Sequence, residues 1–320
     1  MAQVTSNDFK LLAQRAGFDL CGITSPEVIP EAQQRFFSWL DKGYHAEMKW
    51  LTRNVERRTD PNQLGVAARS VIMLGFNYFQ LNTKAIPDDC GRVSRYARGK
   101  DYHKVIEGMI RRLQKLLKTR FPETSQASLK WWVDYGPFLE RAYAAKGGLG
   151  YLAKNGMLIN RQFGSWIFLA EIVTDLELEP DDSNAVNHGR CGKCQLCIDA
   201  CPTGAIIGDG IVDSNLCISY LTVERPKEIA PELGAKMRNL VFGCDICQEV
   251  CPHNGRAKMT TCGDLLPAKG VGEFLNLNQV LSLQSRDEFL QLTAGTALTR
   301  PGPEGLKRNA DVVIRNRQKP

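Results

Sequence analysis

CGKCQLCIDACP, residues 191–202, carries more information about this 320-residue chain than any other stretch. Its four cysteines are separated by two, two and three residues, and a proline follows the last of them. CDICQEVCP, residues 244–252, repeats the end of this pattern, and Cys217 stands between the two runs. The eight cysteines are therefore sufficient for two sites of four thiolates each.

This spacing is typical of bacterial ferredoxins, in which the cysteine before the proline binds the cluster of the other run. The sequence thus predicts two [4Fe-4S] clusters with crossed ligands. The predicted ligands of the first cluster are Cys191, Cys194, Cys197 and Cys251. The predicted ligands of the second cluster are Cys201, Cys217, Cys244 and Cys247.

Zinc sites and disulfides are the alternative uses of such cysteines. CxxC pairs also hold zinc, but a zinc site does not require a CxxCxxC triplet or a CxxxCP end to each run. A disulfide framework is not expected, because nothing in the sequence indicates secretion. The remaining cysteines, Cys21, Cys90 and Cys262, are interpreted as ordinary thiols.

The N-terminal sequence MAQVTSNDFK has no basic region followed by an apolar core, so no signal peptide is expected. The strongly apolar stretch 166–170 ends at Glu171 and is far too short to span a bilayer. We therefore expect a cytoplasmic protein without a membrane segment. A reducing compartment also suits thiolate-bound clusters.

The net charge of +6 is small, but it is unevenly distributed. Residues 92–120 include ten basic and two acidic side chains, and residues 300–320 include six basic and two acidic ones. Concentrated positive charge indicates nucleic-acid binding. A solvated helix face is the alternative interpretation, and composition alone does not separate the two.

Hydrophobic patterns in the first half alternate between helix and strand, which predicts an α/β or α+β fold. Helices are predicted after a cap at Ser6, over residues 30–42, over residues 104–120 and from Pro137 to Lys146. Strands are predicted over residues 20–23, 69–79, 129–134 and 163–174, with a hairpin over residues 206–212.

The polar segment 179–190 predicts a domain boundary. We expect a first domain over residues 1–178, a ferredoxin-like two-cluster module over residues 179–262 and a short helical C-terminal segment over residues 263–320. The first domain is larger than an electron carrier needs, so a second redox group or a substrate is expected there. It contains no GxGxxG or GxxxxGK[ST] motif, which disfavours NAD, FAD and ATP.

Seven stretches carry a resemblance to a known family: GYHAEMKW (43–50), RRTDP (57–61), ARSVIMLGFNY (68–78), RYA (95–97), VDYGPFLER (133–141), GLGYLAKNGMLI (148–159) and FGSWIFLAEIVT (163–174). Together with the paired cysteine runs, they resemble the epoxyqueuosine reductases. These are cobalamin-dependent enzymes, related to reductive dehalogenases, that complete queuosine in the anticodon loop of certain tRNAs.

The resemblance implies that the first domain binds cobalamin. It also implies an oxidoreductase that reduces the epoxide of epoxyqueuosine at the wobble position of tRNA, with cobalamin reduced through the two clusters. Cobalt reduced by two electrons attacks the epoxide, and Asp134 matches the family's proton donor. Because such a donor must hold its proton at neutral pH, the pKa of Asp134 is expected to be raised, by burial beside the apolar corrin or by a nearby negative charge. Its apolar neighbours in the sequence, Trp131, Trp132 and Phe138, are consistent with desolvation.

Further cobalamin contacts implied by the resemblance are Arg57, Ala97, Asp134, Lys154, Asn155, Leu158, Leu169 and Asp245. The implied partners are a tRNA anticodon stem-loop that carries epoxyqueuosine and an unidentified low-potential electron donor. We expect a monomer. The basic stretches 92–120 and 300–320 are the expected contacts to the RNA backbone.

Two other functions stay open on the sequence. One is a cobalamin-dependent reductive dehalogenase, although such enzymes usually carry a twin-arginine export signal and have no need of a basic segment. The other is an electron-transfer ferredoxin with an added partner-binding domain. The chain departs from the family pattern at Tyr135 and at residues 152–153, and it stops where members commonly continue into a helical repeat. We expect either a naturally short member or a truncated one.

Overall fold

The computed structural model describes residues 4–82, 85–181 and 189–318. The helices are α1 (Ser6–Ala16), α2 (Pro30–Asp41), α3 (Val55–Thr59), α4 (Tyr102–Arg120), α5 (Glu140–Lys146), α6 (Leu196–Asp199), α7 (Ile218–Val223), α8 (Pro231–Lys236), α9 (Ile246–Glu249), α10 (Leu277–Ser282), α11 (Arg286–Thr293) and α12 (Gly302–Gln318). The strands are β1 (Leu20–Thr24), β2 (Ser70–Asn77), β3 (Cys90–Val93), β4 (Leu129–Trp132), β5 (Tyr151–Leu152), β6 (Leu158–Ile159), β7 (Ile167–Thr174), β8 (Ile206–Gly208), β9 (Ile211–Val212), β10 (Leu240–Phe242) and β11 (Phe274–Asn276).

The main sheet has the strand order β1-β2-β7-β4, and each neighbouring pair is antiparallel. All eight residues of β2 are buried. A strand is buried on both faces only when both faces of its sheet are covered, which explains the nearly continuous apolar sequence SVIMLGFN. The mixture of helix and sheet is as expected, and the antiparallel pairing makes it α+β rather than a parallel α/β layer.

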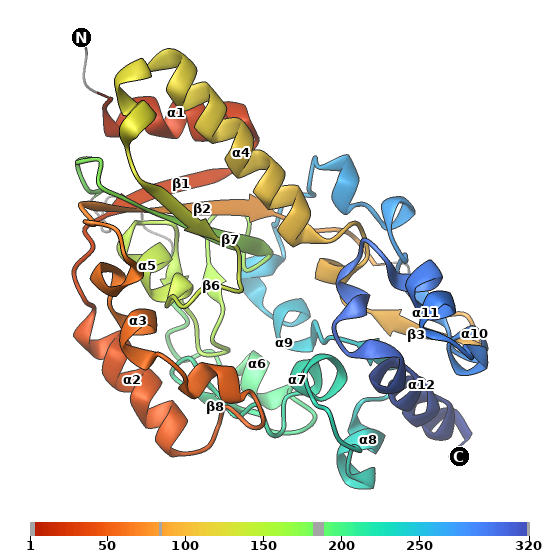
Figure 1. Ribbon diagram of the computed structural model, residues 1–320. Coiled ribbons are helices and arrows are strands. Elements are labelled where there is room, and N and C mark those ends of the chain that lie inside the picture. The colour runs from red at the N-terminus through yellow and green to blue at the C-terminus, as the bar shows by residue number, and fades with distance from the viewer. Residues whose placement is uncertain (1–3, 83–84, 182–188, 319–320) are drawn as a thin grey trace.

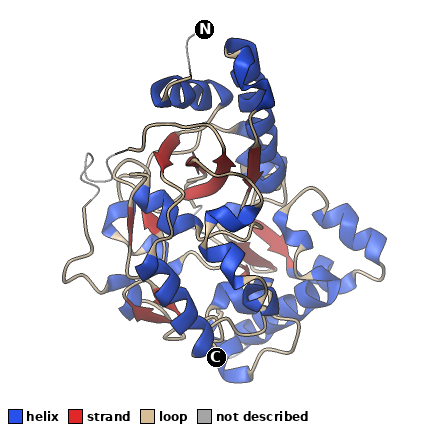
Figure 2. Ribbon diagram, turned by 60° about the vertical axis from the view of Figure 1, so that its left-hand side comes forward, coloured by secondary structure: helices blue, strands red, loops and turns tan. Residues whose placement is uncertain are grey.

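Helices cover both faces of this sheet (Figure 1). α1 and α4 pack together on one face, where Phe9, Ile72 and Ile110 join one apolar cluster. α5 packs against β2 and β7 on the other face, where Met73 and Tyr143 belong to a second cluster. Turned by 60°, the molecule shows its strands toward the middle with helices around them (Figure 2). The helix predicted over residues 104–120 is α4, and its buried residues Ile106, Met109, Ile110, Leu113 and Leu117 recur at helical spacing in the sequence.

A second sheet joins segments that lie far apart in the sequence. β3 pairs in parallel with β10 and antiparallel with β11. β3 comes from the first 178 residues, β10 from the cysteine-rich segment and β11 from the C-terminal segment. This sheet therefore fixes the three predicted domains to one another, and their division stays a prediction. The boundary predicted over residues 179–190 includes residues 182–188, which lie outside the described part of the chain.

Two predicted helix starts are wrong. The side chain of Thr5, not Ser6, caps α1 and completes a capping box with Asp8. Pro137 does not begin a helix, because α5 starts only at Glu140. The backbone from Val133 to Leu139 instead forms a turn-rich connection, which carries Asp134 out of the sheet.

The C-terminal segment is helical as expected. α12 packs against α8, α10 and β10. Arg308 and Asn309 are buried on its inner side, and they hydrogen-bond to backbone carbonyls such as those of Leu221 and Thr222. Among helices of the described residues, none is both long enough and apolar enough to cross a bilayer.

The close packing of α5's end against β1 leads to a stability prediction. A Cβ at Gly22 would lie 2.1 Å from the Gly147 carbonyl oxygen, so Gly22→Ala must displace backbone. Gly108 of α4 has open space around its missing Cβ. We expect Gly22→Ala to lower the free energy of unfolding by about 1–3 kcal/mol. Gly108→Ala should raise it by about 0.5–1 kcal/mol, because alanine is the better helix former.

Anaerobic thermal melts of the two variants test this pair. The expected midpoints lie on opposite sides of the wild-type value. A Gly22→Ala variant that melts at the wild-type temperature would contradict the packing described for β1.

Candidate functional site

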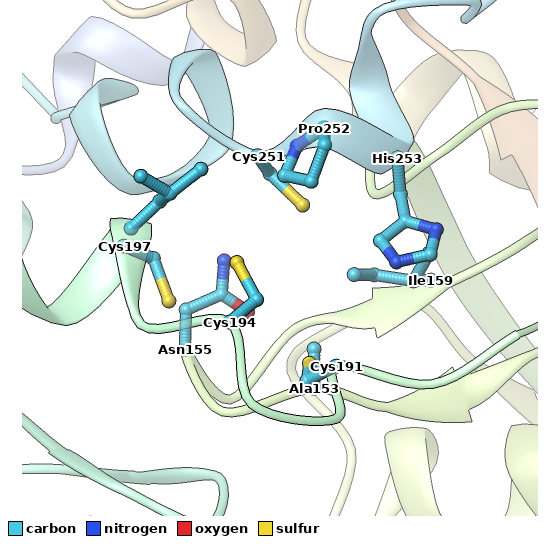
Figure 3. A pocket seen from close by; sticks show the side chains of 10 residues that line it. Ala153, Asn155, Ile159, Cys191, Cys194, Cys197, Cys251, Pro252 and His253 are labelled. Carbon is cyan, nitrogen blue, oxygen red and sulfur yellow. The ribbon is translucent and has the colours of Figure 1, made fainter.

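Four cysteines from two distant segments line one pocket. Cys191, Cys194 and Cys197 come from the first run, and Cys251 comes from the second. Figure 3 shows the sulfur atoms of Cys194, Cys197 and Cys251 turned into a shared space. α6 and α9 pack against each other, which brings the end of the second run to the start of the first. Four thiols around one space are the donor set that a [4Fe-4S] cluster requires.

The other four cysteines also lie near one another. Burial raises the pKa of Cys247 well above its usual value, and the thiols of Cys244 and Cys217 raise it further. Burial raises the pKa of Cys244 to about 12, with added effects of Cys217 and Cys201. Neutral buried thiols at these positions are what binding of iron would replace by thiolates. The structure thus brings together both predicted sets, and the assignment of each ligand stays a prediction.

The loop between β5 and β6 touches both sets. Lys154 Nζ donates hydrogen bonds to the carbonyls of Gly192 and Cys194, at 2.8 and 3.0 Å. Asn155 lines the first pocket, and its Nδ2 donates to the carbonyl of Cys247 at 3.4 Å. Two residues that the sequence assigned to the cofactor pocket therefore hold the backbone of the cysteine loops.

Asp245, between two cysteines of the second set, is bound by the first domain. Its Oδ2 accepts hydrogen bonds from the Arg95 backbone N–H at 2.9 Å and from Arg95 Nη1 at 3.1 Å. The same guanidinium pairs with Glu249 at 2.8 Å and lies over the ring of Trp166. Burial raises the pKa of Asp245, and the charge of Arg95 partly offsets that effect.

Asp134 lies in a turn after β4, with a left-handed backbone (φ 63°). Tyr102 donates its hydroxyl hydrogen bond to Asp134 Oδ2. His103 Nε2 is 3.9 Å from the same oxygen, and His103 Nδ1 is 2.8 Å from Asp101. The Asp134 side chain is 61% exposed. Trp131, Trp132 and Phe138 belong to or pack against the two apolar clusters of the sheet and leave this side chain exposed, so the expected desolvation of Asp134 by a cofactor or by a nearby charge stays a prediction.

Aromatic rings occupy the space between Asp134 and the second cysteine set. The ring of Tyr102 stacks on Phe168 at 4.2 Å between centroids, and Phe168 lies 4.4 Å from Tyr78. The Tyr78 hydroxyl donates to Gln248 of α9 at 3.3 Å. Tyr96 is close enough to both Asp134 and Asp245 for their charges to raise its pKa, after the larger effect of burial. Asp134 and the loop that includes Gln248 thus lie at the two ends of the same row of rings, Tyr102, Phe168 and Tyr78, which we call the aromatic wall.

The other predicted cobalamin contacts differ in how far they are exposed. Arg57 is exposed on α3, and Leu169 is half-buried at the edge of the cluster under β7. Ala97 and Leu158 are buried by the protein itself, at 1% and 4% exposure. A cofactor beside these two would meet mainly their backbone or a side-chain edge.

The basic stretch 92–120 divides into two groups, which corrects the expectation that all of it faces RNA. Arg95 and Arg98 are buried, and Arg92 forms an ion pair with Glu273. Burial lowers the pKa of Arg98 to about 10. Lys100, which precedes α4, is exposed and forms an ion pair with Asp264 at 2.8 Å. The other exposed basic side chains of the stretch belong to α4, and they are Lys104, Arg111, Arg112, Lys115, Lys118 and Arg120. We call these six the α4 basic face.

The C-terminal basic stretch is also used mostly within the fold. Arg300 binds Glu224 through two hydrogen bonds of 2.9 Å, and Arg308 is buried. Arg317 donates to the backbone carbonyl of Pro87. Sequence reasoning missed Tyr102 and His103, because an aromatic pair at a helix start has no distinctive spacing. Their position next to Asp134 depends on the tertiary packing of α4.

Comparisons with known proteins agree with this geometry. Residues 190–254 match the family described as "4Fe-4S double cluster binding domain", and residues 58–134 match "Epoxyqueuosine reductase QueG". The chain is 36% identical over 304 residues to the epoxyqueuosine reductase of Cyclobacterium marinum, covering 95% of each chain.

Solved structures are similar as well. An epoxyqueuosine reductase bound to an epoxyqueuosine-modified tRNA-Tyr stem loop has a TM-score of 0.87 and 28% identity, covering 97% of this chain and 81% of that one. A Bacillus subtilis epoxyqueuosine reductase, with its catalytic aspartate loop swung out of the active site, gives the same TM-score, identity and coverage.

The crossed arrangement of cysteines predicts the effect of Cys251→Ser. Wild-type protein purified without oxygen should contain about eight iron and eight sulfide per chain, from two four-iron clusters. The variant should lose the cluster held by Cys191, Cys194 and Cys197, and keep the other. Iron and sulfide analysis with electron paramagnetic resonance measures this. Loss of the cluster at Cys244 and Cys247 alone would contradict the crossing, and two zinc ions without sulfide would exclude both clusters.

Proposed function

The chain belongs to the epoxyqueuosine reductase family, and we propose that it is the oxidoreductase that converts epoxyqueuosine in tRNA to queuosine with cobalamin bound beside Asp134. Two [4Fe-4S] clusters would pass electrons to the cofactor, one at a time, from a separate low-potential donor. The observation that carries the proposal is the common border of Asp134 and the second cysteine set along the Tyr102–Phe168–Tyr78 wall. The proton donor and the electron source that we assign would then border the same row of aromatic rings.

The residues present fit a corrin cofactor. A corrin ring offers a broad apolar face with amide groups at its edge, so its site needs apolar surface and polar groups together. Tyr135 and Leu152, both large, expose 55% and 40% of their surface. Lys154 and Asn155, two and three residues after Leu152, lie against the cysteine loops. Bound and doubly reduced, cobalamin would supply the nucleophile that opens the epoxide.

The overall reaction consumes two electrons and two protons, and it yields an alkene and water. The oxygen that leaves the epoxide carbon must be protonated, and we assign that step to the Asp134 carboxyl. Tyr102 orients the carboxyl through its hydroxyl. Burial keeps the pKa of Tyr102 well above its ordinary value, so the hydroxyl keeps its proton for this hydrogen bond. Asp101 orients the His103 ring through Nδ1, and Nε2 of that ring lies 3.9 Å from the same Asp134 carboxyl oxygen.

The α4 basic face is the surface that we assign to tRNA. Tyr102 and His103 stand in the first turn of α4, at Asp134, and the basic face extends from Lys104 to Arg120 along the same 19-residue helix. A nucleic-acid strand that places a base at Asp134 would therefore pass a line of exposed cations. A base acted upon by an enzyme is commonly taken out of its stack, and an anticodon loop already offers unpaired bases.

Asp134→Asn tests the catalytic assignment. The variant keeps the size of the side chain and removes the acid, so it should retain both clusters, cobalamin and tRNA affinity. We expect single-turnover reduction of epoxyqueuosine tRNA by pre-reduced protein to slow about 10²–10⁴-fold.

Asp209→Asn is the matched control, because Asp209 also has a left-handed backbone (φ 50°) but lies in the β8–β9 hairpin. It should react at the wild-type rate. If Asp134→Asn did the same, the proton would come from another group. Loss of cobalamin from Asp134→Asn would make Asp134 a structural contact.

The α4 basic face predicts the salt dependence of tRNA binding. Arg112→Gln and Lys115→Gln should each weaken binding and reduce the slope of log affinity against log salt by about 0.7–0.9. Lys236→Gln on α8, at the other end of the molecule from α4 (Figure 1), should change neither. Fluorescence anisotropy of a labelled anticodon stem-loop over a salt series measures both quantities. Equal slopes for all variants would exclude α4 as the RNA contact.

A further inference from the structure

Tyr151 brings a hydroxyl group to the first cysteine set, and the function proposed above gives this group no role. The hydroxyl oxygen lies 3.9 Å from Cys191 Sγ, within hydrogen-bond distance of the larger sulfur atom. Tyr151 stands in β5, within the sequence GLGYLAKN, and it is half-buried. A predicted cluster ligand therefore has a polar contact from outside the two cysteine runs.

The tyrosine is the donor in this contact when iron is bound. Cysteine binds iron as a thiolate, which has no proton to donate. A tyrosine hydroxyl has an ordinary pKa of about 10, so it carries its proton at neutral pH. The contact is then an O–H···S hydrogen bond to a charged acceptor, and such bonds are stronger than those between neutral groups.

The position of the Tyr151 hydroxyl is fixed by its surroundings. The backbone of Tyr151 belongs to the β5–β6 hairpin. Its ring makes an edge contact with the ring of His253, two residues after the last cysteine of the set, at 5.8 Å between centroids. Lys154 of the same hairpin binds the backbone carbonyl of Gly192, next to Cys191, at 2.8 Å. The hairpin and the cysteine loop are thus held to each other on both sides of the hydroxyl.

The second cysteine set has a hydroxyl contact of its own. Thr203 Oγ1 is 3.6 Å from Cys201 Sγ, and Thr203 is 7% exposed. Among the described residues, Cys191 and Cys201 are the two cysteines whose sulfur lies within hydrogen-bond distance of a side-chain hydroxyl. Each predicted cluster therefore has one such donor, and each donor can be removed without the other.

Hydrogen bonds to sulfur are one of the factors that set the reduction potential of an iron–sulfur cluster. A [4Fe-4S] cluster that accepts one electron becomes more negative, and part of the added charge resides on the cysteine sulfurs. An O–H group that points at such a sulfur stabilises the reduced state more than the oxidised state. The presence of the hydroxyl therefore makes the cluster easier to reduce.

We propose that Tyr151 raises the reduction potential of the first cluster through a hydrogen bond from its hydroxyl to the Cys191 thiolate. The cluster then accepts one electron more readily from the low-potential donor. Tyr151 is not a catalytic residue in this role, because it acts through Cys191. The inference rests on the proposed function in one respect, since it requires that the protein bind both clusters.

Tyr151→Phe tests the proposal, because it keeps the ring and removes only the hydroxyl. Anaerobic titration of the holoprotein with dithionite, followed by electron paramagnetic resonance, measures the midpoint potential of each cluster. In Tyr151→Phe, one midpoint should fall. At a fixed potential, the ratio of reduced to oxidised cluster should decrease about three- to tenfold, which corresponds to about 30–60 mV for a one-electron couple.

Two further variants identify the cluster that responds. Thr203→Val removes the hydroxyl at Cys201, so it should lower the other midpoint and leave the Tyr151-dependent one at its wild-type value. Tyr44→Phe is the matched control, since the Tyr44 hydroxyl contacts no cysteine sulfur among the described residues. It should change neither midpoint.

The outcomes separate this inference from the proposed function. Two wild-type midpoints in Tyr151→Phe, with both clusters bound, would overturn the inference alone. A shift of the same midpoint by Tyr151→Phe and Thr203→Val would also overturn it. If Tyr151→Phe bound only one cluster, the hydroxyl would be needed for assembly, and its role in setting the potential would be rejected. Absence of iron and sulfide from the wild-type protein would instead remove the proposed function, and this inference with it.

Discussion

The contact between Arg95 and Asp245 is the constraint on which the arrangement of the two halves depends. Both side chains are buried, and taking an ion pair out of water costs free energy that its attraction only partly returns. What the pair provides is register. Asp245 stands between Cys244 and Cys247, and it accepts hydrogen bonds from both the backbone and the guanidinium of Arg95. The cysteine loop can therefore take only one position relative to the first domain. Parallel pairing of β3 with β10 next to this contact acts in the same direction.

Local spacing in the sequence predicted those features that local spacing controls. The cysteine runs, α4 and the strands β2 and β7 all have recognisable local patterns, and the ends of α4, β2 and β7 lie within four residues of the prediction. Features that depend on contacts between distant parts of the chain could not be predicted from such local patterns. Arg95 and Arg98 looked like part of a surface charge cluster, and only their acceptors from distant segments reveal that they are internal. Tyr102 has no signal of its own for the same reason. Glu171 did have one, since it interrupts the apolar strand IFLAEIVT.

The acidic residues around the Asp134 turn differ in solvent exposure, and this difference limits which of them can contact a substrate. Asp134 is exposed and free to meet a substrate, whereas Glu171 is enclosed and exchanges nothing with solvent directly. In the proposed role of proton donor, an exposed carboxyl on a left-handed turn needs its geometry fixed by the contacts around that turn. Tyr102 and Phe168 provide aromatic packing on one side, and a bound cofactor or substrate would exclude water on the other.

In the proposed function, α4 would link recognition of the RNA to the chemistry at Asp134 as one rigid element. Its inner stripe, including Ile106 and Ile110, is fully packed on the sheet, so the helix is held as a rigid body. Asp101 caps its first turn by accepting a hydrogen bond from the His103 N–H, which fixes the end that meets Asp134. Cations on the outer face of a rigid helix have fixed distances to that end. An RNA strand bound along them would have its register set relative to the carboxyl by the helix geometry alone, at about 1.5 Å per residue. Selection of the target base would then follow from where the RNA backbone is held on α4.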